Sequence, residues 1–239
     1  MRRALVTGGS GALGAAICRR LGAAGRHVYV HANRGADRAE RIAADIIATG
    51  GSASAVAFNV ADAQATEAAL AGVLADGAIE ILINNAGIHD DAVMPGMRRE
   101  QWNSVIDVSL NGFFNVTQPL LLPMIRQRWG RIINITSAAA LAGNRGQVNY
   151  AAAKAGLHGA TRALALELAS RGVTVNAVAP GIIASPMANK AFDQEQISRL
   201  VPMKRAGTPE EVAELVQFLA SESAGYISAQ IISINGGML

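Results

Sequence analysis

The sequence is poor in cysteine and in aromatic residues, and each scarcity excludes a class of protein. Its single cysteine, Cys18, cannot form an internal disulfide, which is typical of proteins from a reducing compartment. Aromatic residues make up 4% of the 239 positions and apolar residues 51%, so the core must be built mainly from Ala, Val, Ile and Leu. These proportions favour a protein with a large aliphatic core over a disulfide-stabilised secreted one.

Long apolar runs and strong charge are also absent. No apolar stretch approaches the roughly 18 residues of a membrane span, and the apolar segment after residues 1–3 is interrupted at Thr7–Ser10, unlike a signal peptide. The net charge is +3 with scattered basic residues, which gives no argument for nucleic-acid binding. His27 and His31 have no carboxylate or cysteine near them in sequence, so we interpret both as strand residues and predict no metal site. These features favour a cytoplasmic protein without a membrane segment.

What the sequence does contain is a regular alternation of strand-like and helical segments. Short apolar, often β-branched runs favour strands at 4–6, 28–30, 53–58, 79–83, 131–136, 173–178 and 230–234. Helical patterns favour helices at 12–24, 37–49, 62–75, 100–128, 148–170 and onward from 208, the fourth of them bent near Pro119 and Pro123. This order predicts a Rossmann-like α/β fold, with a doubly wound parallel sheet of about seven strands between two layers of helices. Because there is no repeat or linker, we expect residues 1–239 to form one domain.

A glycine-rich turn at 7–14 links the first expected strand to the first expected helix. Glycines allow the backbone to approach a pyrophosphate closely, and the helix N-terminus supplies N–H donors and a partial positive charge. The alternative is an ordinary glycine-rich turn, which the flanking strand and helix make less attractive. We assign cofactor contacts in this turn to Gly8, Ser10, Gly11, Leu13 and Gly14.

The choice of cofactor follows from a missing acidic residue. A site for NAD usually has an Asp or Glu about 20 residues beyond the glycines, but here none occurs before Asp37. The second strand ends instead near Asn33 and Arg34, and a guanidinium there would pair with a 2′-phosphate. We therefore predict NADP(H), although Arg34 could be a solvated arginine and Arg38 could take its role.

Tyr150 and Lys154 form the clearest catalytic candidate. Residues four apart on a helix lie on the same face, and a nearby ammonium favours the phenolate, so we expect the pKa of Tyr150 to be lowered. Such a pair is suited to proton exchange with an alcohol oxygen. By itself it could equally be an exposed helix pair, but Ser137 and the glycine-rich turn strengthen the catalytic interpretation.

Several motifs together resemble those of the short-chain dehydrogenase/reductases, in order and in spacing. They are Thr7-Gly8 with Gly14, Asn84-Asn85-Ala86-Gly87, Asn111, Ser137, Tyr150-x-x-x-Lys154, Pro180-Gly181 and Asn235-Gly236-Gly237. The resemblance covers essentially the whole chain. Within that family the sequence is most similar to bacterial 3-oxoacyl-[acyl-carrier-protein] reductases.

The resemblance implies a role for each catalytic candidate. Tyr150 would donate a proton to the carbonyl oxygen, and Ser137 would hydrogen-bond that oxygen. Lys154 would lower the tyrosine pKa and hold the nicotinamide ribose, and Asn111 would help hold a water that links Lys154 to solvent. The cofactor contacts expected outside the glycine-rich turn are Asn33, Arg34, Asn59, Val60, Asn85, Ala86, Gly87, Tyr150, Lys154, Pro180, Gly181, Ile183 and Ser185.

Four positions depart from the family pattern. Ala12 stands where a second glycine is usual, and Gly11 where NADP-using relatives often have a basic residue. Asn59 replaces an aspartate that contacts adenine, and Ser185 replaces a threonine while keeping the hydroxyl. Together these changes predict weaker cofactor binding without loss of catalysis.

The resemblance also implies a substrate, a partner and an assembly. The expected reaction is NADPH-dependent reduction of a 3-oxoacyl thioester on acyl carrier protein, with Arg128 and Arg171 docking the acidic carrier unless they are solvated helix-end residues. A lid is expected at about 186–206, where apolar side chains could cover the acyl chain or belong to the core: Met187, Phe192, Leu200 and Met203. A homotetramer is expected through the two long helices and the last strand.

Two other functions remain open from the sequence. The same chemistry could act on another carbonyl substrate, such as a polyketide, a steroid or a sugar. Alternatively, the chain could be a non-catalytic nucleotide-binding subunit of an assembly, as the departures at Ala12 and Asn59 would allow. The presence of all four catalytic candidates argues against the second possibility, because a non-catalytic protein has no chemical need for them.

Overall fold

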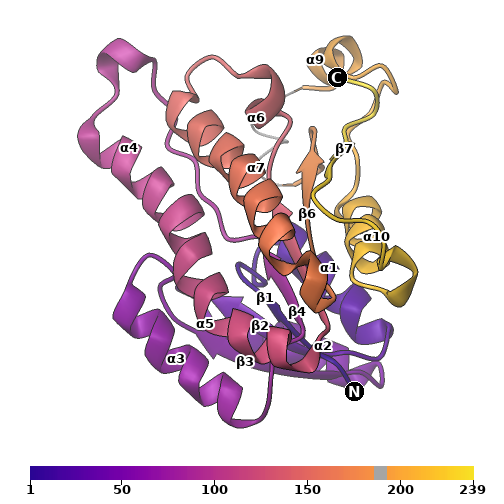
Figure 1. Ribbon diagram of the computed structural model, residues 1–239. Coiled ribbons are helices and arrows are strands. Elements are labelled where there is room, and N and C mark those ends of the chain that lie inside the picture. The colour runs from indigo at the N-terminus through magenta and orange to yellow at the C-terminus, as the bar shows by residue number, and fades with distance from the viewer. Residues whose placement is uncertain (186–192) are drawn as a thin grey trace.

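The computed structural model describes residues 1–185 and 193–239. Its centre is one sheet in which the strands run in the order β3-β2-β1-β4-β5-β6-β7 and every neighbouring pair is parallel (Figure 1). The strands are β1 Arg3–Val6, β2 His27–Ala32, β3 Ser52–Ala57, β4 Ile81–Asn84, β5 Gly130–Ile135, β6 Val173–Pro180 and β7 Ile231–Ile234. The predicted Rossmann-like parallel sheet is therefore confirmed.

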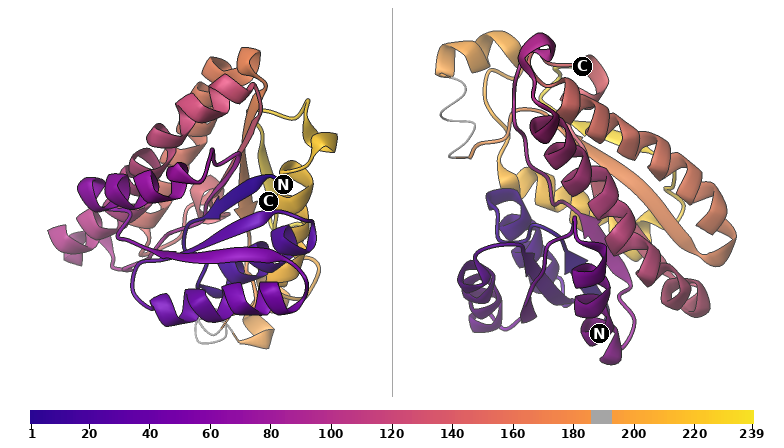
Figure 2. Two further views of the ribbon diagram at one scale, coloured as in Figure 1. Left: turned by 90° about the horizontal axis from the view of Figure 1, so that it is seen from below. Right: turned by 90° about the vertical axis from the view of Figure 1, so that its left-hand side faces the viewer.

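Helices cover both faces of this sheet (Figures 1 and 2). One layer contains α1 Ala12–Ala23, α2 Ala36–Ala48 and α10 Pro209–Leu219. The other contains α3 Ala63–Ala75, α4 Arg99–Ile106, α5 Gly112–Gln127 and α7 Val148–Leu168, while the short helices α6 Ala139–Ala142 and α9 Gln194–Leu200 lie outside the two layers. Every residue of β4, β5 and β6 is buried, as expected for strands with helices on both sides. Among the described helices, none is both long enough and apolar enough to cross a bilayer.

The start of α10 shows how local sequence sets a helix boundary. The Thr208 hydroxyl accepts a hydrogen bond from the Glu211 N–H at 3.2 Å, and the Glu211 carboxylate accepts one from the Thr208 N–H at 2.8 Å. Pro209 occupies the first helical position, where its missing N–H costs nothing. The helix expected from residue 208 therefore begins at Pro209, next to its predicted cap.

The long helix expected at 100–128 is interrupted earlier than predicted. A π-helical turn at Asp107–Asn111 separates α4 from α5, and α5 continues through Pro119 and Pro123. Gly112 follows the turn directly, and a Cβ there would lie 2.9 Å from the Val60 side chain. Close packing against Val60 thus accompanies the irregular turn, a feature that often marks functional sites.

The ends of the strands define two edges of the sheet. At the carboxyl edge, Thr7 follows β1, Asn85 follows β4, Ser137 follows β5 and Gly181 follows β6. The chain order reverses between β1 and β4 at this edge, and in open α/β sheets ligands bind at such a reversal. The residues that precede the strands lie at the opposite edge of the sheet, which we call the amino edge.

Candidate active site

The glycine-rich turn adopts a shape that suits a phosphate group. Gly8 has a φ of +63°, and a Cβ on Gly14 would overlap the carbonyl oxygen of Gly8. Helix α1 begins directly after Gly11 without a side-chain cap and without an acidic residue in its first turn. Its first N–H groups therefore remain for an anionic ligand.

The turn is tied to the loop after β4. The Thr7 hydroxyl accepts hydrogen bonds from the backbone N–H groups of Asn85 and Ala86, both at 3.0 Å. The Asn85 carboxamide donates in return to the carbonyl oxygens of Thr7, at 2.9 Å, and Gly8, at 3.2 Å. The structure thus brings together the predicted cofactor residues from two distant segments.

The predicted 2′-phosphate residues lie at the carboxyl end of β2. Asn33 and Arg34 are exposed there, and α2 begins two residues later. Asp37, the first acidic residue, is paired with Arg41 at 3.1 Å. Within the described residues, neither Arg34 nor Arg38 has a side-chain hydrogen bond or ion pair. Both guanidinium groups therefore remain candidates for a phosphate.

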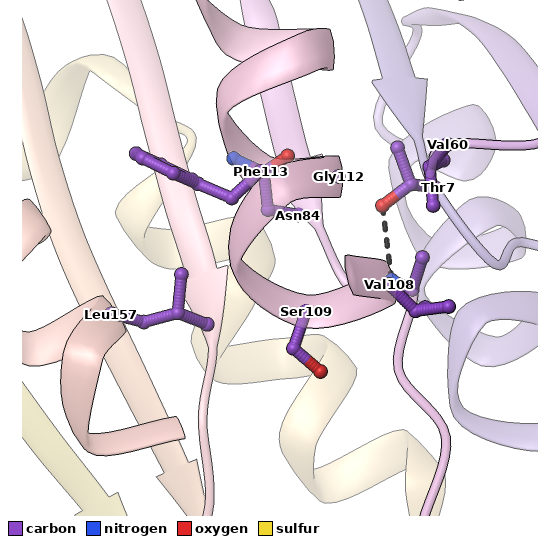
Figure 3. Close-up of a pocket in the computed structure, with 9 residues that line it drawn as sticks. Thr7, Val60, Asn84, Val108, Ser109, Gly112, Phe113 and Leu157 are labelled. Carbon is purple, nitrogen blue, oxygen red and sulfur yellow. Dashed lines mark hydrogen bonds between the residues drawn. The ribbon is translucent and has the colours of Figure 1, made fainter. Parts of the chain in front are cut away.

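The loop after β3 carries Asn59 and Val60. The Asn59 side-chain oxygen accepts a hydrogen bond from the Ala61 N–H at 3.2 Å, and its backbone oxygen accepts one from the Thr66 hydroxyl at 3.1 Å. Val60 is buried and shares a small cavity with Thr7 (Figure 3). One lone pair of the Asn59 amide oxygen is thus used to shape its own loop.

Ser137, Tyr150 and Lys154 converge at the carboxyl edge. Ser137 follows β5, and its hydroxyl accepts a hydrogen bond from the Ala139 N–H at 3.1 Å. Tyr150 and Lys154 lie in the first turns of α7, and the Tyr150 phenol is close enough to Ser137 for that side chain to act on its pKa. The Lys154 ammonium donates to the carbonyl oxygen of Ile135 at 2.9 Å and lies 5.8 Å from the centre of the Tyr150 ring.

The titration behaviour of this group differs from the expectation. Burial raises the pKa of Tyr150 above its ordinary value of 10, and the charge of Asp91 adds to this, while the hydrogen bond with Ser137 acts in the opposite direction. Burial also lowers the pKa of Lys154 to about 8. The structure does not show the lowered Tyr150 pKa, because removal of the phenol from water outweighs its neighbours. A phenol that stays protonated at neutral pH is suited to giving up its proton to a carbonyl oxygen.

Asn111 lies at the end of the π-helical turn, between α4 and α5. Asn111 is exposed, and its carboxamide donates to the carboxylate of Asp107 at 2.7 Å, across the π-helical turn. Ser109 is the buried polar residue of that turn, at 3% exposure. Its hydroxyl has no hydrogen-bond partner among the described residues and adjoins the small cavity near Leu157 (Figure 3). A single serine in a helical pattern gave no sequence signal for this position.

The segment after β6 holds four further predicted cofactor residues. Pro180 ends β6, and a Cβ on Gly181 would lie 2.8 Å from Asn235, so the C-terminal segment packs directly against this loop. Ile183 forms an isolated parallel bridge with Gly207. Ser185 is the last described residue before the gap.

The expected lid lies partly outside the described residues. Met187 and Phe192 belong to the segment 186–192, of which the structure gives no description. In the described part, Leu200 and Met203 are exposed at 46% and 66%. They are therefore not core residues of this protomer, which was one of the two possibilities.

Arg128 and Arg171 lie together but at the other edge of the sheet. They precede β5 and β6, the same strands that lead to Ser137 and Gly181 at their far ends. The Arg128 guanidinium donates to the carbonyl oxygen of Ser170 at 3.2 Å. A six-residue strand is about 20 Å long, so both arginines are separated from Tyr150 by roughly the length of the sheet.

Comparisons with known proteins agree with this geometry. The model of the short chain dehydrogenase family matches residues 2–196. A 3-oxoacyl-[acyl-carrier-protein] reductase of Synechocystis sp. is 46% identical over 238 residues, which cover 99% of this chain and 96% of the relative. The 3-oxoacyl-[acyl-carrier-protein] reductase FabG of Aggregatibacter actinomycetemcomitans is 43% identical over 98% of both chains. The FabG protein of Staphylococcus aureus is also 43% identical, over 99% of this chain and 98% of its own.

Proposed function

The chain belongs to the short chain dehydrogenase family, and we propose that it is a cytoplasmic, NADPH-dependent reductase of 3-oxoacyl thioesters carried on acyl carrier protein. The single observation that carries the reductase proposal is the junction of Ser137, Tyr150 and Lys154 beside the phosphate-shaped turn. The substrate class is supported by the names and full-length similarity of the relatives. Residues 1–239 would form one dinucleotide-binding and catalytic domain.

The residues of the site fit a dinucleotide. The turn is shaped by Gly8 and Gly14, whose backbones approach so closely that a Cβ on Gly14 has no room. The uncapped start of α1 supplies donors for a pyrophosphate. Arg34 or Arg38 would hold a 2′-phosphate, which is the basis for proposing NADP(H) rather than NAD(H). Bound NADPH supplies the hydride that reduces the carbonyl carbon.

The protein's part in the reaction is to manage charge on the substrate oxygen. As the carbonyl is reduced, negative charge develops on oxygen, and the Tyr150 phenol donates its proton there while the Ser137 hydroxyl donates a second hydrogen bond. The positive charge of Lys154 lies close to the tyrosinate that this proton transfer leaves, and stabilises it. Besides its bond to Ile135, Lys154 has two further N–H donors, which would serve the ribose hydroxyls.

Proton resupply is the least direct part of this proposal. Asn111 is expected to hold a water near Lys154. Its exposed carboxamide donates one N–H to Asp107 and keeps its oxygen and second N–H for a water. Ser109, in the same π-helical turn, lines the small cavity, and its buried hydroxyl has no partner among the described residues, so it is a second candidate to hold a water. We therefore propose that Asn111 holds the water that links Lys154 to solvent, with Ser109 as the second candidate.

An assembly would bring the docking arginines to a catalytic site. Large apolar side chains are exposed on α5 and α7, which supports self-association through these helices. They are Phe114 (64% exposed), Leu122 (62%) and Leu166 (81%). In the proposed homotetramer, Arg128 and Arg171 of one protomer would serve the carboxyl edge of its neighbour, because they lie too far from their own.

The proposed reaction is tested by following NADPH consumption with acetoacetyl thioesters of acyl carrier protein and of coenzyme A, with NADH as the cofactor control. We expect reduction with NADPH and a preference for the carrier-linked substrate. Reduction of free ketones or sugars without reduction of either thioester would contradict the proposed substrate.

Docking across protomers is tested with mixed oligomers. We expect low activity on carrier-linked substrate from chains with Tyr150→Phe. We expect the same from chains with both Arg128→Glu and Arg171→Glu. Assembled together, they should recover activity, because one chain supplies the docking surface and the other the catalytic tyrosine. No recovery in verified mixed oligomers would contradict docking across protomers.

A further inference from the structure

His31 makes two side-chain hydrogen bonds that its interpretation as a plain strand residue did not anticipate. It is 1% exposed near the end of β2. Its Nδ1 accepts a hydrogen bond from the backbone N–H of Gly8 at 2.9 Å, and its Nε2 lies 2.9 Å from the carbonyl oxygen of Phe58. Because Nδ1 must be the acceptor, the imidazole proton is on Nε2, which donates to Phe58. Both ring nitrogens are thus used, and the tautomer is fixed.

These two bonds connect different parts of the proposed dinucleotide site. Gly8 belongs to the glycine-rich turn, which faces the pyrophosphate, and Phe58 directly precedes the Asn59–Val60 loop, where the adenine is expected. The His31 backbone oxygen also accepts a hydrogen bond from the Ser10 N–H at 3.3 Å. The imidazole and Phe58 rings are in contact, with their centres 4.2 Å apart.

The bonding pattern requires a neutral imidazole. Burial lowers the pKa of His31 to about 4, so the ring stays uncharged near neutral pH. A protonated ring would have no lone pair for the Gly8 N–H. The orientation of Gly8, which already has the unusual φ of +63°, therefore depends on a group that does not titrate in the working range.

We propose that His31 is a positioning residue for the cofactor, coupling the glycine-rich turn to the Asn59–Val60 loop so that both halves of the site are formed before the ligand arrives. A site set in advance binds more tightly because less ordering is required on binding. This role would offset the weaker contacts expected from Ala12 and Asn59. The inference rests on the proposed dinucleotide function.

Three substitutions separate the two bonds. His31→Phe keeps a ring against Phe58 and removes both bonds. His31→Asn places an amide oxygen near the position of Nδ1, so it can keep the bond from Gly8 and lose the one to Phe58. His31→Gln places an amide N–H near the position of Nε2, so it can keep the bond to Phe58 and lose the one from Gly8.

His27 provides a matched control. It is a second histidine on the same strand, four residues earlier and at the amino edge, and it bonds Ser52 rather than the turn. His27→Phe therefore makes the same chemical change away from the proposed site. Thermal unfolding of every variant reports whether it is folded.

The experiment measures dissociation constants for NADPH, by its fluorescence, and for 2′-AMP, which has the adenine and the 2′-phosphate but no pyrophosphate. We expect His31→Phe to weaken NADPH binding by about tenfold or more, because without the two bonds the turn and the loop must be ordered when the ligand binds. The kcat at saturating NADPH should change little. His31→Gln should weaken the binding of NADPH and leave the binding of 2′-AMP unchanged. His31→Asn should weaken the binding of 2′-AMP. His27→Phe should change neither dissociation constant.

The possible failures are distinct. Unchanged NADPH binding in a folded His31→Phe, or identical effects of the Asn and Gln variants on both ligands, would overturn the role of His31 alone. A wild-type protein that binds neither NADPH nor NADH would overturn the proposed function and this role with it. Should His31→Phe fail to fold, the opposite ligand patterns of the Asn and Gln variants still decide the question.

Discussion

A cluster at the amino edge and the ligand-facing groups at the carboxyl edge use their polar atoms in opposite ways. At the amino edge, Arg2 stacks on Trp129, with its guanidinium carbon 3.3 Å from the ring centre. Glu222 accepts hydrogen bonds from Arg2 at 2.6 Å and from the Trp129 indole at 3.0 Å. At the carboxyl edge, by contrast, the N–H groups that begin α1 are uncapped and the Ser109 hydroxyl is unpartnered within the described chain.

This difference separates stability from function. Polar groups that hydrogen-bond to one another stabilise the fold. Polar groups without a partner in the protein can bind a ligand. Substitutions within the Arg2, Trp129 and Glu222 cluster should therefore change the free energy of unfolding without changing the reaction. Substitutions at the carboxyl edge should change the reaction or cofactor binding with little loss of stability.

The largest expected effect comes from Tyr150→Phe. Removing the general acid should lower kcat by about a thousandfold, while the NADPH dissociation constant and the unfolding temperature should stay near their wild-type values. Steady-state kinetics and thermal unfolding on the same preparation check this. Near-normal turnover would remove Tyr150 from the mechanism.

Arg34→Asp tests which residue at the carboxyl edge recognises the cofactor. Loss of a charge-assisted bond to a 2′-phosphate should raise the KM for NADPH by at least about tenfold and leave the KM for NADH nearly unchanged. Arg38→Asp is the matched control on the same segment. A larger effect from Arg38→Asp would transfer the role to that residue, and equal effects on both cofactors would contradict phosphate recognition at Arg34.

The pH dependence of reduction should report Lys154. Burial lowers its pKa to about 8. The side chain is therefore protonated below that pH and loses its positive charge as the pH rises through it. Because the positive charge stabilises the tyrosinate formed during turnover, kcat should fall along an alkaline limb centred near the same pH. Lys154→Arg, whose guanidinium keeps its charge, should shift that limb to higher pH. An unshifted limb in an active variant would assign it to another group.

Trp129→Ala is the corresponding test of the amino edge, with the smallest effect on the reaction. Loss of the stacking and of the bond to Glu222 should lower the free energy of unfolding by about 2 kcal/mol. The kcat and the NADPH dissociation constant of the folded variant should remain within about twofold of the wild type, because Trp129 precedes β5 at the amino edge. Denaturant unfolding and kinetics together decide whether the edges are as separate as the structure indicates.

Local patterns in the sequence were sufficient for the sheet and much of the site. The alternation of strands and helices, the glycine-rich turn and the capping box at Thr208 are each encoded within a few neighbouring residues. The joint role of Ser137, Tyr150 and Lys154 was expected from the resemblance to the short-chain dehydrogenase/reductases.

The remaining features depend on packing between distant segments. The π-helical turn at Asp107–Asn111 changes which side chains face inward, so regular helical periodicity gave no reason to expect a buried Ser109. The raised pKa of Tyr150 depends on burial, which spacing does not report. The bond from Gly8 to His31 joins the glycine-rich turn to strand β2, and their approach is set by the whole fold.

The central claim is that Tyr150 remains protonated until the substrate oxygen takes its proton. The most direct measurement is a pH titration of tyrosinate absorbance in the cofactor-free protein, taken as the difference between the wild type and Tyr150→Phe. We predict a midpoint above the ordinary tyrosine pKa of 10, because burial opposes the phenolate. A midpoint near or below neutral pH would contradict the account and restore an acidified tyrosine.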